Sequence, residues 1–174
     1  MAASTFTSRL RRLLRHRWLD EDDTRKAIPP AMVERLMRRV AASEGRHSGE
    51  IRICVEASLP SSYIWRDATP RERALAMFGK LRVWDTGNNN GVLIYLLLAE
   101  HAIEIVADRG LSSRVPPAEW TAMVQRMGDA FRQGRFEEGL TQALEEVSAL
   151  LVRHFPAAAG TVNPNELPDE PVLG

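Results

Sequence analysis

The sequence has a single cysteine, Cys54, and no apolar stretch long enough to cross a membrane. One cysteine excludes an intrachain disulfide and fits a reducing compartment. The longest apolar run, residues 92–99, is far shorter than the roughly 20 residues that a membrane helix needs. No early apolar run precedes a small-residue cleavage site, so we expect no signal peptide and a cytoplasmic protein.

The chain also has no net charge at pH 7, because 23 Lys and Arg residues balance 23 Asp and Glu residues. A neutral chain gives no general case for nucleic-acid binding. The four histidines are dispersed, which leaves a zinc site or a histidine-based triad unsupported. The sequence has no Walker phosphate loop, dinucleotide fingerprint or G-x-S-x-G elbow. Enzymes that are recognised by such motifs are therefore excluded.

Charge is nevertheless unevenly placed, since residues 1–27 form a basic arm. Its five arginines precede the first acid, Asp20, and apolar residues lie between them near helical spacing. This pattern predicts an amphipathic helix that lies on anionic lipid or on a protein partner. The alternatives are a helix docked on the domain and a poorly ordered terminus. The arginines are Arg9, Arg11, Arg12, Arg15 and Arg17, and the apolar residues are Phe6, Leu10, Leu13, Leu14, Trp18 and Leu19.

The middle of the chain alternates helical and strand patterns. Residues 50–59 alternate apolar with polar side chains and predict a strand, and a helix capped by Thr69 follows. Residues 92–98 are almost wholly apolar, as in a parallel strand buried on both faces. Strand, crossover helix and strand make a βαβ unit with parallel strands. A reversal at residues 100–101 then predicts a third strand, antiparallel to the second and nearer the sheet edge.

Further amphipathic helices are predicted to begin at Pro29-Pro30 and to cover residues 119–132 and 136–154. We therefore predict an α/β fold, namely an α/β/α sandwich. Its small mixed sheet combines the βαβ unit with an antiparallel hairpin, and helices cover both faces. The domain spans residues 28–155, and residues 156–174 form a disordered tail because their composition turns to Ala, Gly, Pro, Asn and Glu.

Two polar loops flank the predicted hairpin and should emerge at the same end of it. One loop precedes the second strand and the other follows the third strand. Carboxylate and amide oxygens are ligands for hard cations such as Ca²⁺. We therefore predict a divalent-metal site at this end, with Arg109 as a further candidate residue. The predicted ligands are Asp85, Asn88, Asn89, Asn90 and Asp108.

Both loops also have a purely structural interpretation. Asn and Gly are ordinary turn residues, and the spacing is not that of an EF-hand. Arg109 can simply pair with Asp108 or Asp85, and a surface pair of that kind contributes on the order of 0–1 kcal/mol. Cys54 lies in a predicted buried strand, where a core role is favoured over a nucleophilic one.

Four segments in this order give the chain a resemblance to a known family. They precede the first strand, open the second, end the third and join the last two helices. They are Ser48-Gly49-Glu50-Ile51, Asn89-Asn90-Gly91-Val92-Leu93, Ile103-Glu104-Ile105-Val106-Ala107-Asp108-Arg109-Gly110 and Phe131-Arg132-Gln133-Gly134-Arg135-Phe136-Glu137-Glu138-Gly139. Over about residues 28–155 the chain resembles the TPM domain family, as a bacterial-type member without a signal peptide or a membrane helix.

The resemblance implies an α/β/α sandwich and a loop site that binds divalent metal in some relatives. It also implies either an accessory role at membrane proteins or the acid phosphatase activity of plant thylakoid members. The chain departs from the family at Ile28-Pro29-Pro30-Ala31, where many relatives carry an acidic residue, and Asp108 is its own feature. These departures favour an interaction module with a protein partner. The alternative is a metal-dependent hydrolase that uses Asp85 and Asp108, and whether the chain is an enzyme stays open.

Overall fold

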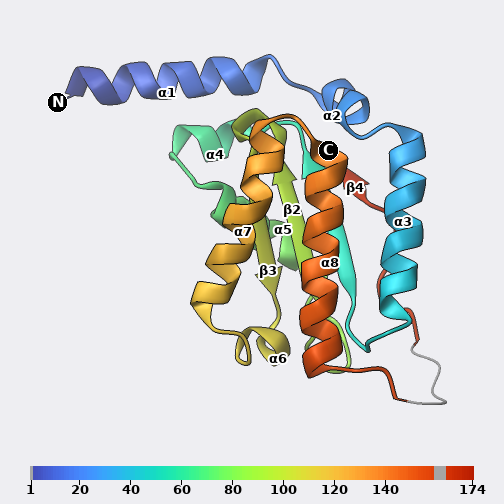
Figure 1. Ribbon diagram of the computed structural model, residues 1–174. Coiled ribbons are helices and arrows are strands. Elements are labelled where there is room, and N and C mark those ends of the chain that lie inside the picture. The colour runs from blue at the N-terminus through green and yellow to red at the C-terminus, as the bar shows by residue number, and fades with distance from the viewer. Residues whose placement is uncertain (1, 159–163) are drawn as a thin grey trace.

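Figure 1 shows the computed structural model, which describes residues 2–158 and 164–174. In residues 2–9 only the backbone is described, so Phe6 and Arg9 of the predicted arm lie outside the described side chains. The helices are α1 (Ala2–Arg17), α2 (Glu21–Ala27), α3 (Pro30–Glu44), α4 (Ser61–Trp65), α5 (Pro70–Lys80), α6 (Arg109–Ser112), α7 (Pro117–Arg132) and α8 (Phe136–His154). The strands are β1 (Ile51–Glu56), β2 (Val92–Leu97), β3 (Ala102–Ala107) and β4 (Val172–Leu173).

The four strands form one mixed sheet in the order β3-β2-β1-β4. β1 pairs parallel with β2, and β2 pairs antiparallel with β3, which confirms the predicted βαβ unit and hairpin. The hairpin turns through a short 3₁₀ helix, Leu98–Glu100, and His101 completes the turn in the left-handed region with φ of 48°. β3 lies at a sheet edge, as its alternating pattern predicted.

Helices cover both faces of the sheet, so the predicted α/β/α sandwich is confirmed (Figure 1). The larger core packs α3, α7 and α8 against one face, and the smaller core packs α5 against the other. Every residue of β1 and β2 is buried, as expected for central strands covered on both faces. In the larger core, Gly139 of α8 lets the ring of Phe131 pack directly against the helix, because a Cβ there would lie 2.8 Å from the ring.

The last residues of the chain correct one prediction. Residues 164–174 are not a disordered tail, because β4 pairs parallel with β1 on the side away from β2. Arg52 donates hydrogen bonds to the carbonyl oxygens of Pro168 and Glu170, and Leu167 is buried in the smaller core. A polar composition predicted disorder, but a few apolar residues suffice when an open strand edge supplies main-chain partners. Residues 159–163 lie outside the described part of the chain.

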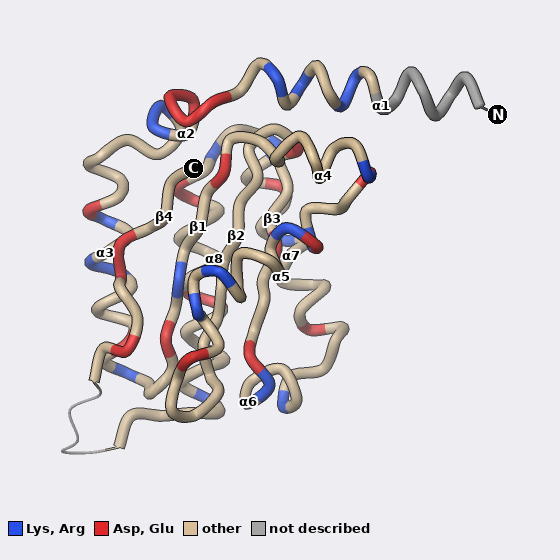
Figure 2. Tube along the Cα trace, turned by 180° about the vertical axis from the view of Figure 1, so that it is seen from behind, with Lys and Arg blue, Asp and Glu red and all other residues tan. Residues whose placement is uncertain are grey.

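The predicted basic arm consists of two helices. α1 runs along one end of the domain (Figure 1), and α2 carries an acidic first turn (Figure 2). Asp20 caps α2, because its side chain accepts hydrogen bonds from the backbone N–H groups of Asp22 and Asp23. Among the described residues, no helix is long and apolar enough to span a bilayer.

Candidate functional site

The two polar loops of the predicted site emerge at the same rim of the sheet. The first residue of β2 is paired with the last residue of β3. Just beyond that pair, the backbone N–H of Asp108 donates to the carbonyl oxygen of Gly91 at 2.9 Å. The N–H of Gly110 then donates to the carbonyl oxygen of Asn89 at 2.8 Å. We call this pair of joined loops, residues 84–91 and 108–110, the loop rim.

Asp108 is the predicted site residue with the most distinctive surroundings. It caps α6, because its Oδ1 accepts the backbone N–H of Arg109 at 2.6 Å. Its Oδ2 is buried and has no hydrogen-bond partner among the described residues. An enclosed carboxylate oxygen without a donor is costly, unless a proton or a cation stabilises it. Oδ2 of Asp108 is therefore an atom of the predicted ligand set that the described residues leave without a donor.

Asp85 lies on the loop before β2, but its carboxylate already has a cationic partner. Arg82, three residues earlier, reaches Asp85 Oδ2 with Nη2 at 2.5 Å, and both side chains are exposed. Asp85 does not line the hollow beside Asp108. The structure thus brings the two predicted carboxylates to one rim without directing both into one cavity.

The three asparagines divide between different roles. Asn89 has φ of 51° and shapes the turn, as the turn interpretation anticipated, and Asn88 is exposed. Asn90 is fully buried and its Nδ2 donates to the carbonyl oxygen of Ser48 at 3.0 Å, which ties the loop to the residues before β1. Its Oδ1 is buried and has no hydrogen-bond partner among the described residues. Asn90 is therefore mainly a structural link.

An open hollow of about 570 Å³ lies over this rim. It is lined by Trp84, Asn89, Asp108, Arg109 and Gly110. Among the described residues, no carboxylate lies within ion-pair distance of Arg109, so neither predicted pair with Asp108 or Asp85 forms. The residues that line the hollow therefore include an acidic, a basic, an amide and an aromatic residue.

The donor set fits a weak oxygen-ligand cation site better than a transition-metal site. In the part of the chain that the structure describes, no group of three or more His, Cys, Asp and Glu side chains gathers as metal ligands. A cation at the rim would rest on Asp108 and on amide or carbonyl oxygens of the asparagine loop. Calcium accepts such ligands, whereas zinc and copper prefer nitrogen and sulfur.

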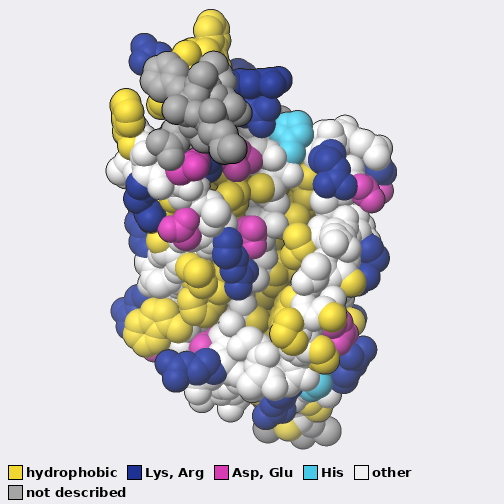
Figure 3. Space-filling model, turned by 90° about the vertical axis from the view of Figure 1, so that its left-hand side faces the viewer, with side chains coloured by type: hydrophobic (Ala, Val, Ile, Leu, Met, Phe, Trp, Pro, Cys, Tyr) yellow, Lys and Arg dark blue, Asp and Glu magenta, His cyan; other side chains and the backbone are white. Residues whose placement is uncertain are grey.

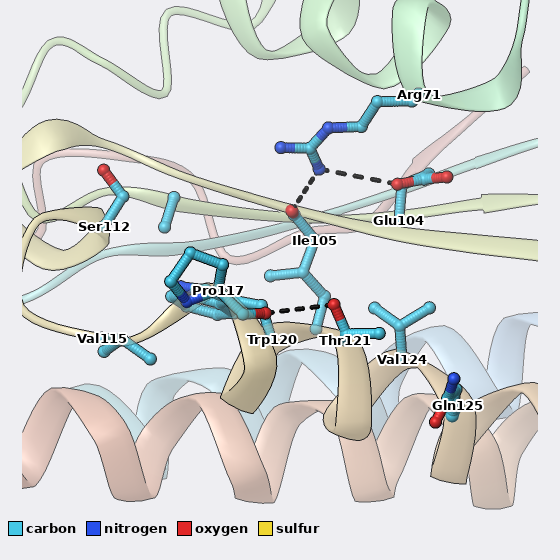
Figure 4. A pocket seen from close by; sticks show the side chains of 11 residues that line it. Arg71, Glu104, Ile105, Ser112, Val115, Pro117, Trp120, Thr121, Val124 and Gln125 are labelled. Atoms are coloured by element: carbon cyan, nitrogen blue, oxygen red, sulfur yellow. Dashed lines mark hydrogen bonds and ion pairs between the residues drawn. The ribbon is translucent and has the colours of Figure 1, made fainter.

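A second hollow, of about 500 Å³, was not anticipated from the sequence. It follows the edge of β3 beside α7, on the side of the molecule where Figure 3 shows apolar side chains gathered, and Figure 4 shows Ile105, Trp120 and Val124 lining it. Arg71 crosses the edge, where its Nη1 donates to the carbonyl oxygen of Ile105 at 2.5 Å and lies 3.5 Å from Glu104. Burial raises the pKa of the Glu104 carboxyl. Arg71 thereby occupies the carbonyl oxygen of Ile105, which a further strand pairing with the open edge of β3 would need as a hydrogen-bond acceptor.

The C-terminal segment reaches the loop rim from the other side. Both carboxylate oxygens of Glu166 accept the backbone N–H of Gly87, at 3.2 and 3.1 Å. The next residue, Leu167, donates its N–H to Glu50 Oε2 at 3.2 Å. This contact could not be predicted from the sequence, because nothing in a polar tail indicates which loop it will meet.

Glu44, the last residue of α3, is buried, and its Oε1 accepts the N–H of Ile51 at 2.9 Å. Burial raises the pKa of Glu44 from 4.5 to about 8, and the charges of Glu50 and Asp169 act in the same direction. As pH rises, the carboxyl of Glu44 therefore loses its proton at a lower pH in the unfolded chain than in the folded one. The contribution of Glu44 to the free energy of unfolding declines as pH rises from about 4.5 to about 8 and is lowest above that range.

We expect Glu44→Gln, which keeps an oxygen for the Ile51 N–H, to gain stability relative to the unsubstituted chain across that window. Allowing for partial solvation, the gain is on the order of 2 kcal/mol above pH 8 and near zero at low pH. Urea denaturation of both proteins at several pH values measures it. The burial-lowered pKa of His47, about 4, affects both proteins alike and cancels. A difference that does not change with pH would contradict the account.

Neither the cysteine nor any histidine lines the hollow over the loop rim. Cys54 is buried in the smaller core, and burial raises the pKa of its thiol to about 12, which fits the predicted core role. His16 and His47 are buried elsewhere, and no histidine lines the two hollows described above. The rim thus lacks the usual acid–base groups apart from carboxylates.

Comparisons with known proteins agree with this architecture. The model of the TPM domain matches residues 22–150. The NMR structure of the BA42 protein from the psychrophilic bacterium Bizionia argentinensis is similar, with a TM-score of 0.73 and 25% sequence identity. The alignment covers 84% of this chain and 95% of that one. No curated protein gave a match. Since the family model covers well over half of the sequence, the chain belongs to the TPM domain family.

Proposed function

We propose that this TPM domain is an accessory or interaction module that acts beside membrane proteins and binds a divalent cation, namely Ca²⁺, at the loop rim. The observation that carries the cation proposal is the enclosed Oδ2 of Asp108, which has no donor among the described residues. The amide of Asn89 lines the same hollow and supplies a neutral oxygen. The predicted cytoplasmic location and the protein partner stay predictions.

A binding role is favoured over catalysis by the chemistry of the rim. Proton transfer needs a group whose pKa is tuned near the working pH, and histidine is the usual choice. Neither the rim nor its hollow holds a histidine or a cysteine. Asp85 is neutralised by Arg82, so it is poorly placed to act as a second ligand or base. One free carboxylate is enough to help hold a cation but is a sparse set for hydrolysis.

Calorimetric titration with Ca²⁺ tests the proposal, and Asp108→Asn is the informative variant. Asparagine still caps α6 through its side-chain oxygen but removes the negative charge, so we expect the affinity to fall about tenfold or more. Asp85→Asn is the matched control, because it removes a rim carboxylate outside the hollow and should change the affinity little. Equal affinities of Asp108→Asn and the unsubstituted chain, or no binding by either, would refute the cation site.

The alternative is a metal-dependent acid-phosphatase-like hydrolase that uses Asp85 and Asp108. It is favoured by Arg109, which lines the hollow beside Asp108 and whose side chain has no carboxylate at ion-pair distance among the described residues. Such a guanidinium can bind a phosphate oxygen through two parallel hydrogen bonds. Metal-dependent turnover of p-nitrophenyl phosphate that is lost in Asp85→Ala and Asp108→Ala would select this alternative.

A further inference from the structure

Helix α1 divides its described side chains between two faces. The inner face docks on the domain through Arg12, Leu13 and His16. Arg12 Nε lies 2.7 Å from Glu100 Oε1, and His16 Nε2 lies 2.9 Å from the same oxygen. The N–H of Leu59 donates to His16 Nδ1 at 3.0 Å, and Leu13 packs against the smaller core. These contacts of the inner face hold α1 on the domain.

The outer face carries a hydrophobic stripe whose residues belong to neither core. Leu10 and Leu14 lie one helical turn apart on α1, and Trp18, the turn residue directly after the helix, continues the same four-residue spacing. Their exposed fractions are 48%, 49% and 80%. Single exposed hydrophobic residues are normal, but two on one helix face, continued by a third directly after the helix, are characteristic of an interaction surface.

Positive charge borders this stripe on both sides. Arg11 and Arg15 follow Leu10 and Leu14 by one position each, Arg17 precedes Trp18, and all three arginines are exposed. Two copies of this face would bring like charges together, which disfavours self-association through α1. An anionic lipid surface is complementary to it, because headgroups meet the arginines while the apolar side chains enter the boundary layer.

We propose that the outer face of α1 binds the surface of a bilayer that contains anionic phospholipid. This deepens the accessory role proposed above by naming the surface on which the domain rests, and it does not depend on the loop-rim cation. α1 lies at the end of the domain where Glu100 follows β2, whereas the loop rim precedes β2 at the opposite end (Figure 1). A domain held by α1 therefore presents its loop rim away from the membrane.

Vesicle co-sedimentation of the full chain tests the proposal, with phosphatidylcholine vesicles that either contain or lack phosphatidylglycerol. We expect binding to the anionic vesicles, little binding to the neutral ones, and release as salt rises. Leu14→Gln should weaken binding about fivefold or more, and Arg11→Gln with Arg15→Gln about tenfold or more. The matched control is Leu75→Gln, because Leu75 of α5 is 50% exposed, like Leu14, but lies outside the arm.

Three results would overturn the inference. The first is equal sedimentation of Leu14→Gln and Leu75→Gln with anionic vesicles, and the second is no sedimentation of the full chain. The third is a concentration-dependent dimer that Leu14→Gln abolishes, which would assign the stripe to a second copy. Unfolding temperatures of both variants check that they are folded, since both substitutions lie at the surface. Calcium titration is read separately, so failure of lipid binding leaves the loop-rim result standing.

Discussion

Replacing Gly110 with alanine is expected to force the two loops of the rim apart and to destabilise the protein by about 1–3 kcal/mol. A Cβ at this position would lie 2.6 Å from the carbonyl oxygen of Asn88 and closer still to that of Asn89. Both obstacles are main-chain atoms, so no side chain can swing aside to make room. The backbone must move instead, and the hydrogen bond from Gly110 N–H to Asn89 is the first that it would break.

The functional consequence should exceed the loss of stability. If a cation is bound between Asp108 and the asparagine loop, separating the loops by even part of an ångström spoils its coordination, and calcium affinity should fall below detection. Gly79→Ala is the matched control, since a Cβ there meets nothing within 4 Å and the residue lies inside α5. That variant should be about 0.5–1 kcal/mol more stable and should bind calcium normally. Urea denaturation and calorimetry measure both effects, and a Gly110→Ala protein that matches Gly79→Ala in each would contradict the steric argument.

The sheet could be predicted because its signals are local. The apolar run of β2 marks a strand buried on both faces, and the alternation in β1 and β3 has the two-residue period of a strand. Chain length between the strands then fixes their directions, since a tight turn permits only antiparallel pairing. The convergence of the two polar loops follows from these directions without any knowledge of side-chain packing.

The individual site residues could not be predicted in the same way, because their partners are chosen by packing. Asp85 forms an ion pair with Arg82, and the amide of Asn90 donates a hydrogen bond to the carbonyl oxygen of Ser48. Asp85 and Asn90 both belong to the predicted ligand set. The hydrogen bond from the N–H of Gly87 to the carboxylate of Glu166 joins positions 79 residues apart, and it depends on the pairing of β4 with the open edge of β1. A single sequence carries no local signal for such contacts, so the prediction located the rim but not its chemistry.

The second large effect is expected at Glu56, a buried carboxylate at the end of β1. Its Oε2 accepts the hydroxyl of Tyr95 at 2.7 Å and Nε of Arg73 at 2.8 Å, and a second Arg73 nitrogen reaches Oε1. The pKa of Tyr95 is raised by burial and by the charge of Glu56, so its hydroxyl stays a donor. Glu56→Ala leaves a guanidinium and a hydroxyl enclosed without their acceptor, and we expect a loss of about 3–5 kcal/mol.

An exposed pair of the same geometry separates the effect of burial from that of charge. Arg35 also holds its partner, Glu137, through two nitrogens, at 2.7 and 2.8 Å, but their side chains are 45% and 36% exposed, against 14% and 11% for Arg73 and Glu56. Water can solvate either partner at the surface, so Glu137→Ala should cost no more than about 1 kcal/mol.

The double variant Glu56→Ala with Arg73→Ala should be less destabilised than the sum of the single variants, because removing both partners leaves no unpaired charge. Urea denaturation of these variants gives the four values of the cycle and the surface control. Similar losses at Glu56 and Glu137 would mean that the network of Glu56, Arg73 and Tyr95 is solvated in solution, and the end of β1 would then be open to water rather than sealed by α5.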